Sequence, residues 1–373
     1  MNTKQAYKSP GAIFSLLNYN PKRISMMLVF LLVCVSCYSI PRVVEHSNDL
    51  LLPAPLTPGD TILFVSPSGP LDSARIFLAK QRLEERGYAV IHSRDILRSR
   101  GYLGGSDKRR AEELMNAFKS PGIKAIFPGT GGYGTTRILD RLDYQIIRDN
   151  PKILIGFSDI TALHLAINKM TGLVTFHTPN PMYGLGSENN LSTASAHYFW
   201  KALEDNNPKG YTIELDSFEL SDSIIVINKG KCTGELIGGN LSLISTLMGT
   251  KYEIDAHGKI LFIEDVGEAP YRIDRFLSQL KLAGIFENVN GIILGKFTRR
   301  SDEPPDDPES FSIREVLEQY FSELDVPVIA NYPVGHYKDN ISLPIGVPAE
   351  LDSDNKIIRL LTSPTHLDKR KSL

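Results

Sequence analysis

Three polar residues of different types stand where segments expected to be strands come to an end: Ser158, Glu264 and His336. A serine becomes a nucleophile when a histidine takes its proton, and a carboxylate can hold that histidine in the required tautomer. If the fold brings the three residues together, they predict acyl transfer through a covalent intermediate.

Ser158 lies where the sequence changes its period. Residues 153–155 form an apolar run typical of a buried parallel strand, and Ile160, Leu163 and Ile167 then repeat at helical spacing. A sharp turn from strand to helix exposes a serine beside unpaired helix amides, which stabilise negative charge. A helix N-cap is the alternative function of Ser158, and Ile160 replaces the second glycine of the Gly-x-Ser-x-Gly pattern.

Two glycine-rich turns, 66–69 and 129–134, follow predicted strands at 61–65 and 124–127. Neither a Gly-Lys-Ser/Thr sequence nor a suitably spaced acidic residue accompanies the second turn, so nucleotide phosphate is not its indicated ligand. Glycines whose amides approach a substrate oxygen are one interpretation, and ordinary tight turns are the other.

Two further histidines are nearer in sequence to the serine. His164 falls within the predicted helix after Ser158, so its side chain points along that helix and away from the turn. His177 follows the next predicted strand and is a candidate substrate contact.

The elements that must position these residues fall into two groups. From Gly59, strands alternate with helices, which predicts an N-terminal α/β domain with a parallel sheet covered by helices on both faces. Short strands from Cys232 onward predict a smaller, β-rich, barrel-like C-terminal domain; they are expected at 233–237, 259–263, 291–294, 327–331, 341–345, 349–351 and 357–361. The predicted boundaries are 59–185, a connecting region 186–231, 232–363 and a tail 364–373.

The composition excludes several classes of protein. A length of 373 residues suggests two domains, and 42% apolar with 23% charged residues is ordinary for a globular protein. A net charge of -2 gives no basic field for nucleic acid. Cys34, Cys37 and Cys232 are too few for a disulfide framework or a cysteine-rich metal site.

Residues 1–58 are expected to be a leader. Lys22 and Arg23 precede an apolar run at 24–35, which fits the core of a signal peptide, and a lipoprotein processing site at Cys37 follows. Residues 47–58 would then be a tether, and the protein would be exported or membrane-anchored in the bacterial cell envelope. The alternatives are an uncleaved signal anchor or an extended start before a cytoplasmic enzyme.

Five ordered motifs between about Gly59 and Leu361 carry a specific resemblance. They are 131–134 (Gly-Gly-Tyr-Gly) followed by Arg137, 156–159 (Gly-Phe-Ser-Asp), 238–241 (Gly-Gly-Asn-Leu), 263–275 and 335–336 (Gly-His). These motifs resemble those of the LD-carboxypeptidase (muramoyl-tetrapeptide carboxypeptidase) family.

The resemblance implies a serine peptidase without metal or cofactor. By motif, the nucleophile corresponds to Ser158, the orienting glutamate to Glu264 rather than Glu268, and the base to His336. The oxyanion hole would use the amides of Asp159 and of Gly131 or Gly132, and the candidate substrate contacts are Tyr133, Asn240 and His177. The implied reaction releases the terminal D-alanine of a murein tetrapeptide.

One position departs from the family pattern, because Thr130 stands where arginine is common; substrate preference is expected to depend on it. A self-immunity peptidase acting on a microcin C-type aminoacyl nucleotide is the rival within the family, and it would need an aromatic platform that Trp200 is not expected to supply. A non-catalytic peptide-binding lipoprotein is the rival of another class. A homodimer is a family expectation that no sequence feature establishes.

Overall fold

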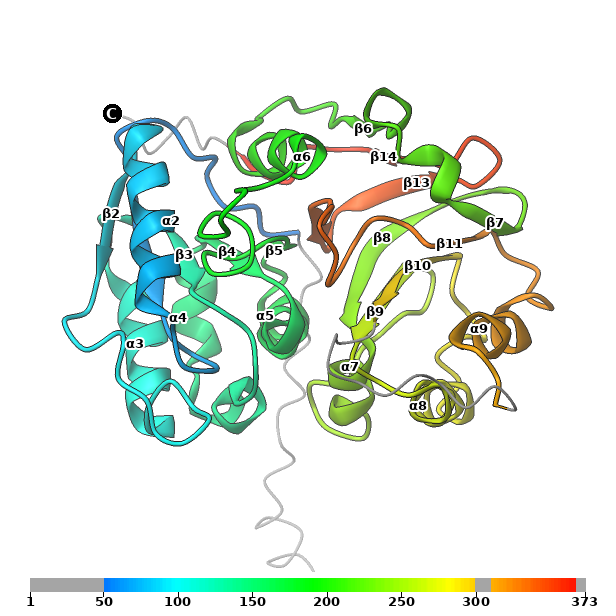
Figure 1. Ribbon diagram of the computed structural model, residues 1–373, viewed down its shortest axis with the longest axis horizontal. Helices are drawn as coiled ribbons and strands as arrows, with labels where there is room; N and C mark the ends of the chain where they lie inside the picture. The colour runs from blue at the N-terminus through cyan, green and yellow to red at the C-terminus, as the bar shows by residue number, and fades with distance from the viewer. Residues whose placement is uncertain (1–49, 299–309, 367–373) are drawn as a thin grey trace, which may run out of the picture. The chain divides into compact units, whose positions relative to one another are not determined.

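A computed structural model describes residues 50–298 and 310–366 and contains two sheets (Figure 1). The first has six strands in the order β12-β5-β4-β3-β1-β2, and the second has eight in the order β6-β14-β13-β8-β9-β10-β11-β7. The leader up to residue 49, including the proposed lipidation site Cys37, lies outside the described residues.

The six-stranded sheet confirms the predicted N-terminal α/β domain. Five of its strands run parallel: β1 (Thr61–Val65), β2 (Ala89–His92), β3 (Ile123–Pro128), β4 (Ile153–Gly156) and β5 (Thr175–His177). The helices between them are α2 (Ser73–Glu85), α3 (Asp107–Lys119), α4 (Tyr144–Asp149) and α5 (Thr161–Thr171). Three begin at side-chain N-caps, because the carboxylates of Asp72 and Asp143 and the hydroxyl of Ser106 accept from first-turn amides.

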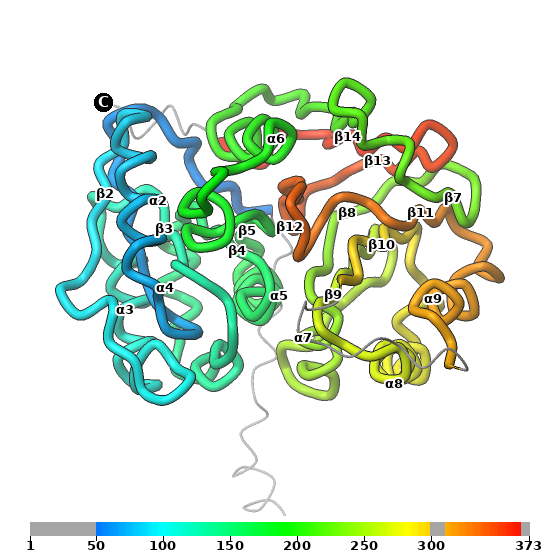
Figure 2. The backbone as a smooth tube through the Cα atoms, viewed as in Figure 1, coloured from blue at the N-terminus to red at the C-terminus, as the bar shows by residue number. Residues whose placement is uncertain are grey.

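The sixth strand corrects a prediction. Residues 341–345 were expected in the C-terminal sheet, but β12 (Leu343–Ile345) pairs antiparallel with β5, with Leu343 opposite His177. Figure 2 shows this late segment beside the much earlier β5. An apolar run predicts a strand but not its partner, and an antiparallel edge on a parallel sheet is common.

The eight-stranded sheet curls into a half-barrel and confirms the predicted β-rich C-terminal domain. Its strands are β6 (Thr212–Ile213), β7 (Ile225–Asn228), β8 (Lys231–Asn240), β9 (Ile260–Val266), β10 (Gly291–Thr298), β11 (Val328–Ala330), β13 (Pro348–Asp352) and β14 (Ile357–Leu360). Helices α7 (Leu241–Leu247), α8 (Pro270–Leu282) and α9 (Ile313–Phe321) accompany it. A capping box of Ser312 and Glu315 opens α9.

The predicted connecting region 186–231 and the described part of the predicted tether, residues 50–58, are part of the fold. β6 and β7, from the predicted connecting region, form the two edges of the eight-stranded sheet, and α6 (Thr193–Glu204) lies in the same region. Leu56, in the predicted tether, is buried, and its N–H donates to the carbonyl of Leu203 over 2.8 Å. Residues 50–58 therefore pack on the domain.

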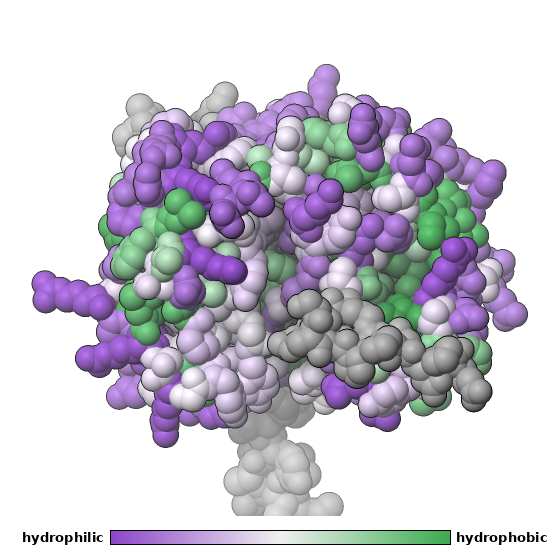
Figure 3. Space-filling model, in the orientation of Figure 1, coloured by the Kyte–Doolittle hydropathy of each residue, from purple (hydrophilic) through white to green (hydrophobic). Residues whose placement is uncertain are grey.

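Apolar strand residues form the core, and polar residues dominate the surface. Ile153, Leu154 and Ile155 of β4 are fully buried, as are Leu261 and Ile263 of β9. Hydrophilic side chains cover most of the face seen in Figure 3, where apolar residues form smaller patches. Among the residues that the structure describes, no helix is both long enough and apolar enough to cross a membrane.

Candidate active site

The turn after β4 is a strained elbow. Ser158 has a φ of +64°, which is unfavourable for a residue with a side chain. Gly156 has a φ of +134°, and a Cβ placed on it would lie 3.0 Å from the side chain of Ile160. Ile160 therefore packs over Gly156 within the turn, which forms an elbow although the second glycine of the pattern is missing.

Glu264 and His336 form a buried pair. Nδ1 of His336 lies 2.7 Å from Oε2 of Glu264, which is fully buried in β9. Gly335 has a φ of +105°, and a Cβ there would overlap the same carboxylate oxygen. Only glycine therefore lets the chain approach Glu264 closely enough to place the histidine.

Each member of the pair shifts the pKa of the other toward its charged form. Burial alone would lower the pKa of His336, but the attraction to Glu264 and the hydrogen bond outweigh burial and raise it. Burial alone would raise the pKa of Glu264, but His336 more than offsets this effect, so that pKa is lowered. The arrangement favours a carboxylate that can stabilise an imidazolium.

Ser158 and His336 line one cavity of about 1130 Å³. The ring of Phe157, next to the serine, lies 4.8 Å from the imidazole between centroids, which places His336 beside the elbow. No hydrogen bond joins Ser158 to His336 among the described residues. Catalytic hydrogen bonds are often long without substrate and shorten when it binds.

The glycine turn after β3 lies directly against the serine. A Cβ on Gly131 would lie 2.8 Å from Cβ of Ser158 and 3.3 Å from the amide nitrogen of Asp159. The carbonyl of Gly131 accepts from the N–H of Gly69 over 3.0 Å. Because a trans peptide directs its carbonyl and N–H to opposite sides, the N–H of Gly132 points away from Gly69.

The N-terminal and C-terminal domains meet at the helix that follows the elbow. The N–H of Asn240 donates to Oγ1 of Thr161 over 3.0 Å, and a Cβ on Gly239 would lie 2.6 Å from the same oxygen. Asn240 stands opposite Glu264 in the register of β8 and β9. One close contact therefore connects the elbow helix to the strand that carries the glutamate.

The three candidate substrate contacts lie outside the lining of the cavity. Tyr133 is 49% exposed and packs its ring edge-on against Tyr102, while Asn240 is buried and caps α7. His177 is fully buried, with its ring near those of Phe157 and Phe262. Burial lowers the pKa of His177 to about 4, so it is neutral near pH 7.

The other residues singled out by sequence also have structural partners. The predicted orientation of His164 was wrong, because its side chain points back to the elbow, where Nε2 lies 2.9 Å from the carbonyl of Gly156. Trp200 stacks on Tyr88 and lies under the guanidinium of Arg86, away from the cavity lining. Thr130, at the position of the common arginine, does line the cavity.

One wall of the cavity was missed by sequence reasoning. It comprises residues of the loop after β5, namely Pro179, Asn180, Tyr183, Gly184 and residues 187–192. Tyr337, Lys338 and Asn340, which follow His336 in the sequence, also line the cavity. The guanidinium of Arg82 donates to the carbonyls of Leu185 and Ser187, each over 2.6 Å, and so fixes this loop. The irregular sequence 178–181 at the carboxyl end of a strand was the available signal.

No group of three or more histidine, cysteine, aspartate or glutamate side chains within 50–298 and 310–366 is arranged to hold a metal ion.

Comparison with known proteins gives the same class for both halves of the chain. The family model for the LD-carboxypeptidase N-terminal domain matches residues 62–178, and the one for the LD-carboxypeptidase C-terminal domain matches residues 233–351. A relative from Bacillus subtilis named probable murein peptide carboxypeptidase is 38% identical over 304 residues, covering 82% of this chain and 92% of its own.

Solved structures share the fold. The microcin C7 self-immunity protein MccF, in an inactive mutant apo state, superposes with a TM-score of 0.77 at 30% identity, covering 84% of this chain and 99% of its own. The Escherichia coli MccF sequence is 32% identical over 339 residues, which are 83% of this chain and 95% of that protein. The muramoyltetrapeptide carboxypeptidase of Oxalobacter formigenes has a TM-score of 0.70 at 28% identity, covering 82% and 100% of the two chains.

The two-domain fold and these matches define a hydrolase of the peptidase class. More narrowly, the chain belongs to the LD-carboxypeptidase family.

Proposed function

We propose that this protein is a serine-type LD-carboxypeptidase that releases the terminal D-alanine of murein tetrapeptides and leaves a tripeptide. The observation that carries the proposal is the shared cavity, in which Ser158 on a strained elbow faces the same space as His336 paired with buried Glu264. Relatives named as murein peptide and muramoyltetrapeptide carboxypeptidases support the choice of substrate.

The geometry supports acyl transfer by general-base catalysis. With Nδ1 of His336 donating to Glu264, Nε2 is the nitrogen free to take the proton of Ser158. The serine oxygen bonds to the scissile carbonyl carbon, and the imidazolium then protonates the departing amine of D-alanine. Water activated by the same histidine releases the tripeptide from the ester.

The oxyanion of the tetrahedral intermediate would lie between the elbow and the glycine turn. The amide of Asp159 and that of Gly132, which the Gly131–Gly69 hydrogen bond directs away from Gly69, are the proposed donors. Removal of one such donor typically costs about 3 kcal/mol of barrier.

One basic residue of the cavity lining, which also contains Glu188, suits a substrate with a free terminal carboxylate. Lys338 is the one lysine or arginine among the described lining residues, and its side chain is 75% exposed. In the part of the chain that the structure describes, the only ion pair of Lys338 is a long one, 3.9 Å to Asp339. We therefore assign to Lys338 the attraction of the D-alanine carboxylate.

A tetrapeptide, a longer pentapeptide and a nucleoside compound together test this function. The enzyme is expected to release D-alanine from a murein tetrapeptide but to leave a pentapeptide ending in D-alanyl-D-alanine intact, because that terminal bond joins two D-centres. An aminoacyl sulfamoyl adenosine, the kind of compound bound in a solved MccF complex, serves as the competing substrate. Cleavage of the nucleoside compound without D-alanine release from the tetrapeptide would refute the proposed substrate.

We also propose that the protein acts in the cell envelope, attached through lipidated Cys37. The basis is the sequence of the leader alone, with Lys22, Arg23 and the apolar run 24–35 before the cysteine. Full-length protein expressed in bacteria is expected to incorporate labelled palmitate and to sediment with membranes, whereas Cys37→Ala should not be labelled. Equal labelling of the two proteins would rule out this anchor.

A further inference from the structure

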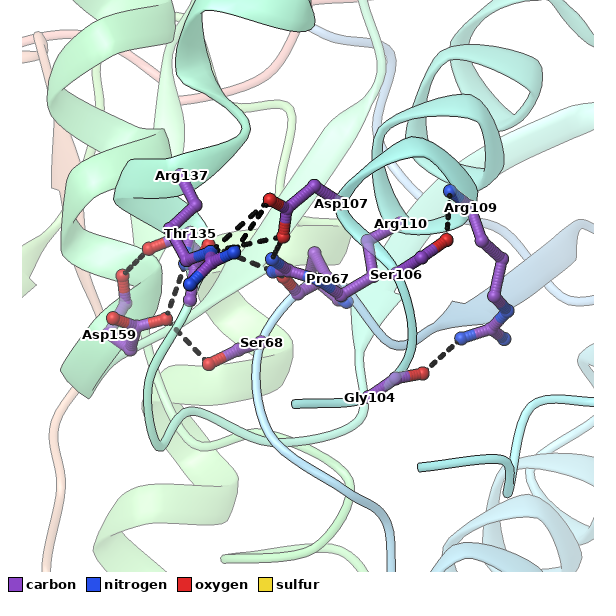
Figure 4. Close-up of polar contacts among 11 residues, drawn as sticks. Pro67, Ser68, Gly104, Ser106, Asp107, Arg109, Arg110, Thr135, Arg137 and Asp159 are labelled. Carbon is purple, nitrogen blue, oxygen red and sulfur yellow. Dashed lines mark hydrogen bonds and ion pairs between the residues drawn. The ribbon is translucent and has the colours of Figure 1, made fainter. Parts of the chain in front are cut away.

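We propose that the carboxylate of Asp159 is a positioning residue that fixes both oxyanion donors, an inference that rests on the proposed function. The backbone amide of Asp159 is one proposed donor, and the other belongs to the glycine turn after β3. The side chain of the same residue holds that turn and the turn after β1 against the elbow (Figure 4).

The carboxylate is buried and accepts from two different turns. Oδ2 of Asp159 receives the hydroxyl of Ser68 over 2.5 Å and the N–H of Thr135 over 2.9 Å. The hydroxyl of Thr135 donates in turn to the carbonyl of Asp159 over 2.6 Å. Asp159 thus connects the elbow to Ser68 in the turn after β1 and to Thr135, which directly follows the glycine turn after β3.

Helix capping does not explain this carboxylate. An aspartate that follows a turn serine is expected to accept from the first amides of its helix. Here neither the short 3-10 segment Ser158–Ile160 nor α5 has a side-chain cap hydrogen bond. The side chain points across to the neighbouring turns instead.

Arg110 braces the same two turns from the other side. Its guanidinium, fully buried on α3, donates to the carbonyls of Pro67 and of Gly134, the latter over 2.8 Å. Pro67 precedes Ser68 and Gly134 precedes Thr135. Arg110 and Asp159 therefore hold consecutive residues at each of the two places. Figure 4 shows the two braces on opposite sides of these turns.

The held geometry determines where the donors point. Between the two braces, Gly69 donates to the carbonyl of Gly131, the contact that directs the N–H of Gly132. A shift of either turn would misplace this amide relative to the amide of Asp159. Donors must lie within about 2.7–3.1 Å of the developing oxyanion, so small displacements reduce the rate more than they reduce ground-state binding.

The test compares two substitutions of one residue. Asp159→Ala is expected to lower kcat by about 100-fold, in the range seen for a lost oxyanion donor, with KM within about 3-fold of wild type. Asp159→Asn keeps a carbonyl oxygen where Oδ2 accepts both hydrogen bonds, so it is expected to stay within about 10-fold of wild type. Asp143→Ala, which removes an exposed helix cap, is the control and should leave kcat unchanged.

A second readout separates this inference from the proposed substrate. The rate at which a fluorophosphonate modifies Ser158 also depends on the oxyanion donors but requires no murein peptide. It should fall in Asp159→Ala and be largely restored in Asp159→Asn. A wild type that reacts with the probe but releases no D-alanine would refute the substrate and leave the positioning role supported by the same probe rates.

Two results would overturn the positioning role. One is that folded Asp159→Ala retains the kcat and the fluorophosphonate reaction rate of the wild type. The other is that the alanine and asparagine variants lose kcat and probe reactivity to the same extent. If the alanine variant does not fold, Ser68→Ala decides, because it removes one of the two donors to Oδ2. It should lower kcat by about 10-fold at constant KM, on the scale of a misplaced oxyanion donor, and an unchanged kcat would refute the role.

Discussion

Nδ1 of His336 lies 2.7 Å from the fully buried carboxylate of Glu264. Glu264 is on β9, and the neighbouring strand β8 contacts the helix after the elbow at Thr161. The pair comes from the C-terminal domain, and Ser158 comes from the N-terminal one. Activity on the proposed mechanism therefore depends on the contact between the domains as well as on the three side chains.

The pH dependence of kcat/KM should report His336. The base must be neutral to accept a proton, and its pKa is raised from the ordinary 6.5 because the attraction to Glu264 outweighs burial. Activity should therefore be lost as pH falls through a value above 6.5. A profile that stays flat from pH 8 down to pH 6 would contradict this assignment.

Glu264→Gln should move that acidic limb. Without the Glu264 carboxylate, burial lowers the pKa of the imidazole against only the smaller attraction of Asp265, so the limb is expected at lower pH. We expect kcat to fall by about 100-fold or more, as for other orienting carboxylates. The measurement is kcat/KM against pH for both proteins. His177 cannot account for a limb near neutrality, since burial lowers its pKa to about 4, and an unmoved limb would exclude Glu264 as its cause.

Strain at the elbow should appear in stability measurements. Ser158→Ala keeps a side chain at a φ of +64°, whereas Ser158→Gly removes the steric cost. The glycine variant is expected to be more stable than the alanine variant by about 1 kcal/mol, after the entropy cost of glycine is subtracted. Urea denaturation of the two inactive proteins measures the difference, and a less stable glycine variant would refute the strain.

Gly131→Ala should damage catalysis through contact with the nucleophile. The added Cβ would lie 2.8 Å from Cβ of Ser158 and 3.0 Å from its hydroxyl oxygen, so the serine or the turn must shift. We expect kcat to fall by about 100-fold, as when an oxyanion donor is lost. Gly122→Ala is the matched control, because its Cβ would meet nothing within 4 Å; equal activity of the two variants would contradict the proposed position of Gly131.

Lys338→Met should weaken binding of substrates with a free terminal carboxylate. An exposed ion pair typically contributes up to about 1 kcal/mol, so KM for the tetrapeptide should rise by about 3- to 5-fold and the effect should shrink in high salt. Lys108→Met removes a similarly exposed charge from α3 and is the control. The assignment fails if the two variants have the same KM.

Much of the fold could be predicted because it depends on local patterns. Apolar runs identified β1, β3 and β4, and the change of period at Ser158 identified the helix that follows the elbow, α5. The strand pairing of β12 could not be predicted, since it joins residues that lie far apart in the sequence. Strand propensity contains no information about partners.

The site could be predicted in part for the same reason. The sequence predicted Ser158, Glu264 and His336 at strand ends, but only Ser158 directly follows its strand, because Glu264 lies within β9 and His336 in the loop after β11. Ser158 and His336 line one cavity, and Glu264 is hydrogen-bonded to His336. Asn240 and His177 were candidate substrate contacts, but both are buried and lie outside the cavity lining. The sequence indicated a role only for the backbone amide of Asp159, and the contacts of its side chain with Ser68 and Thr135 depend on the three-dimensional packing.

The decisive measurement is the release of D-alanine from a murein tetrapeptide by wild-type protein and by Ser158→Ala. Circular dichroism verifies that both proteins are folded. The wild type should yield stoichiometric D-alanine and tripeptide, and the variant none above background. Equal release by both proteins would contradict the assignment of Ser158 as nucleophile, and no release by the folded wild type would contradict the proposed activity itself.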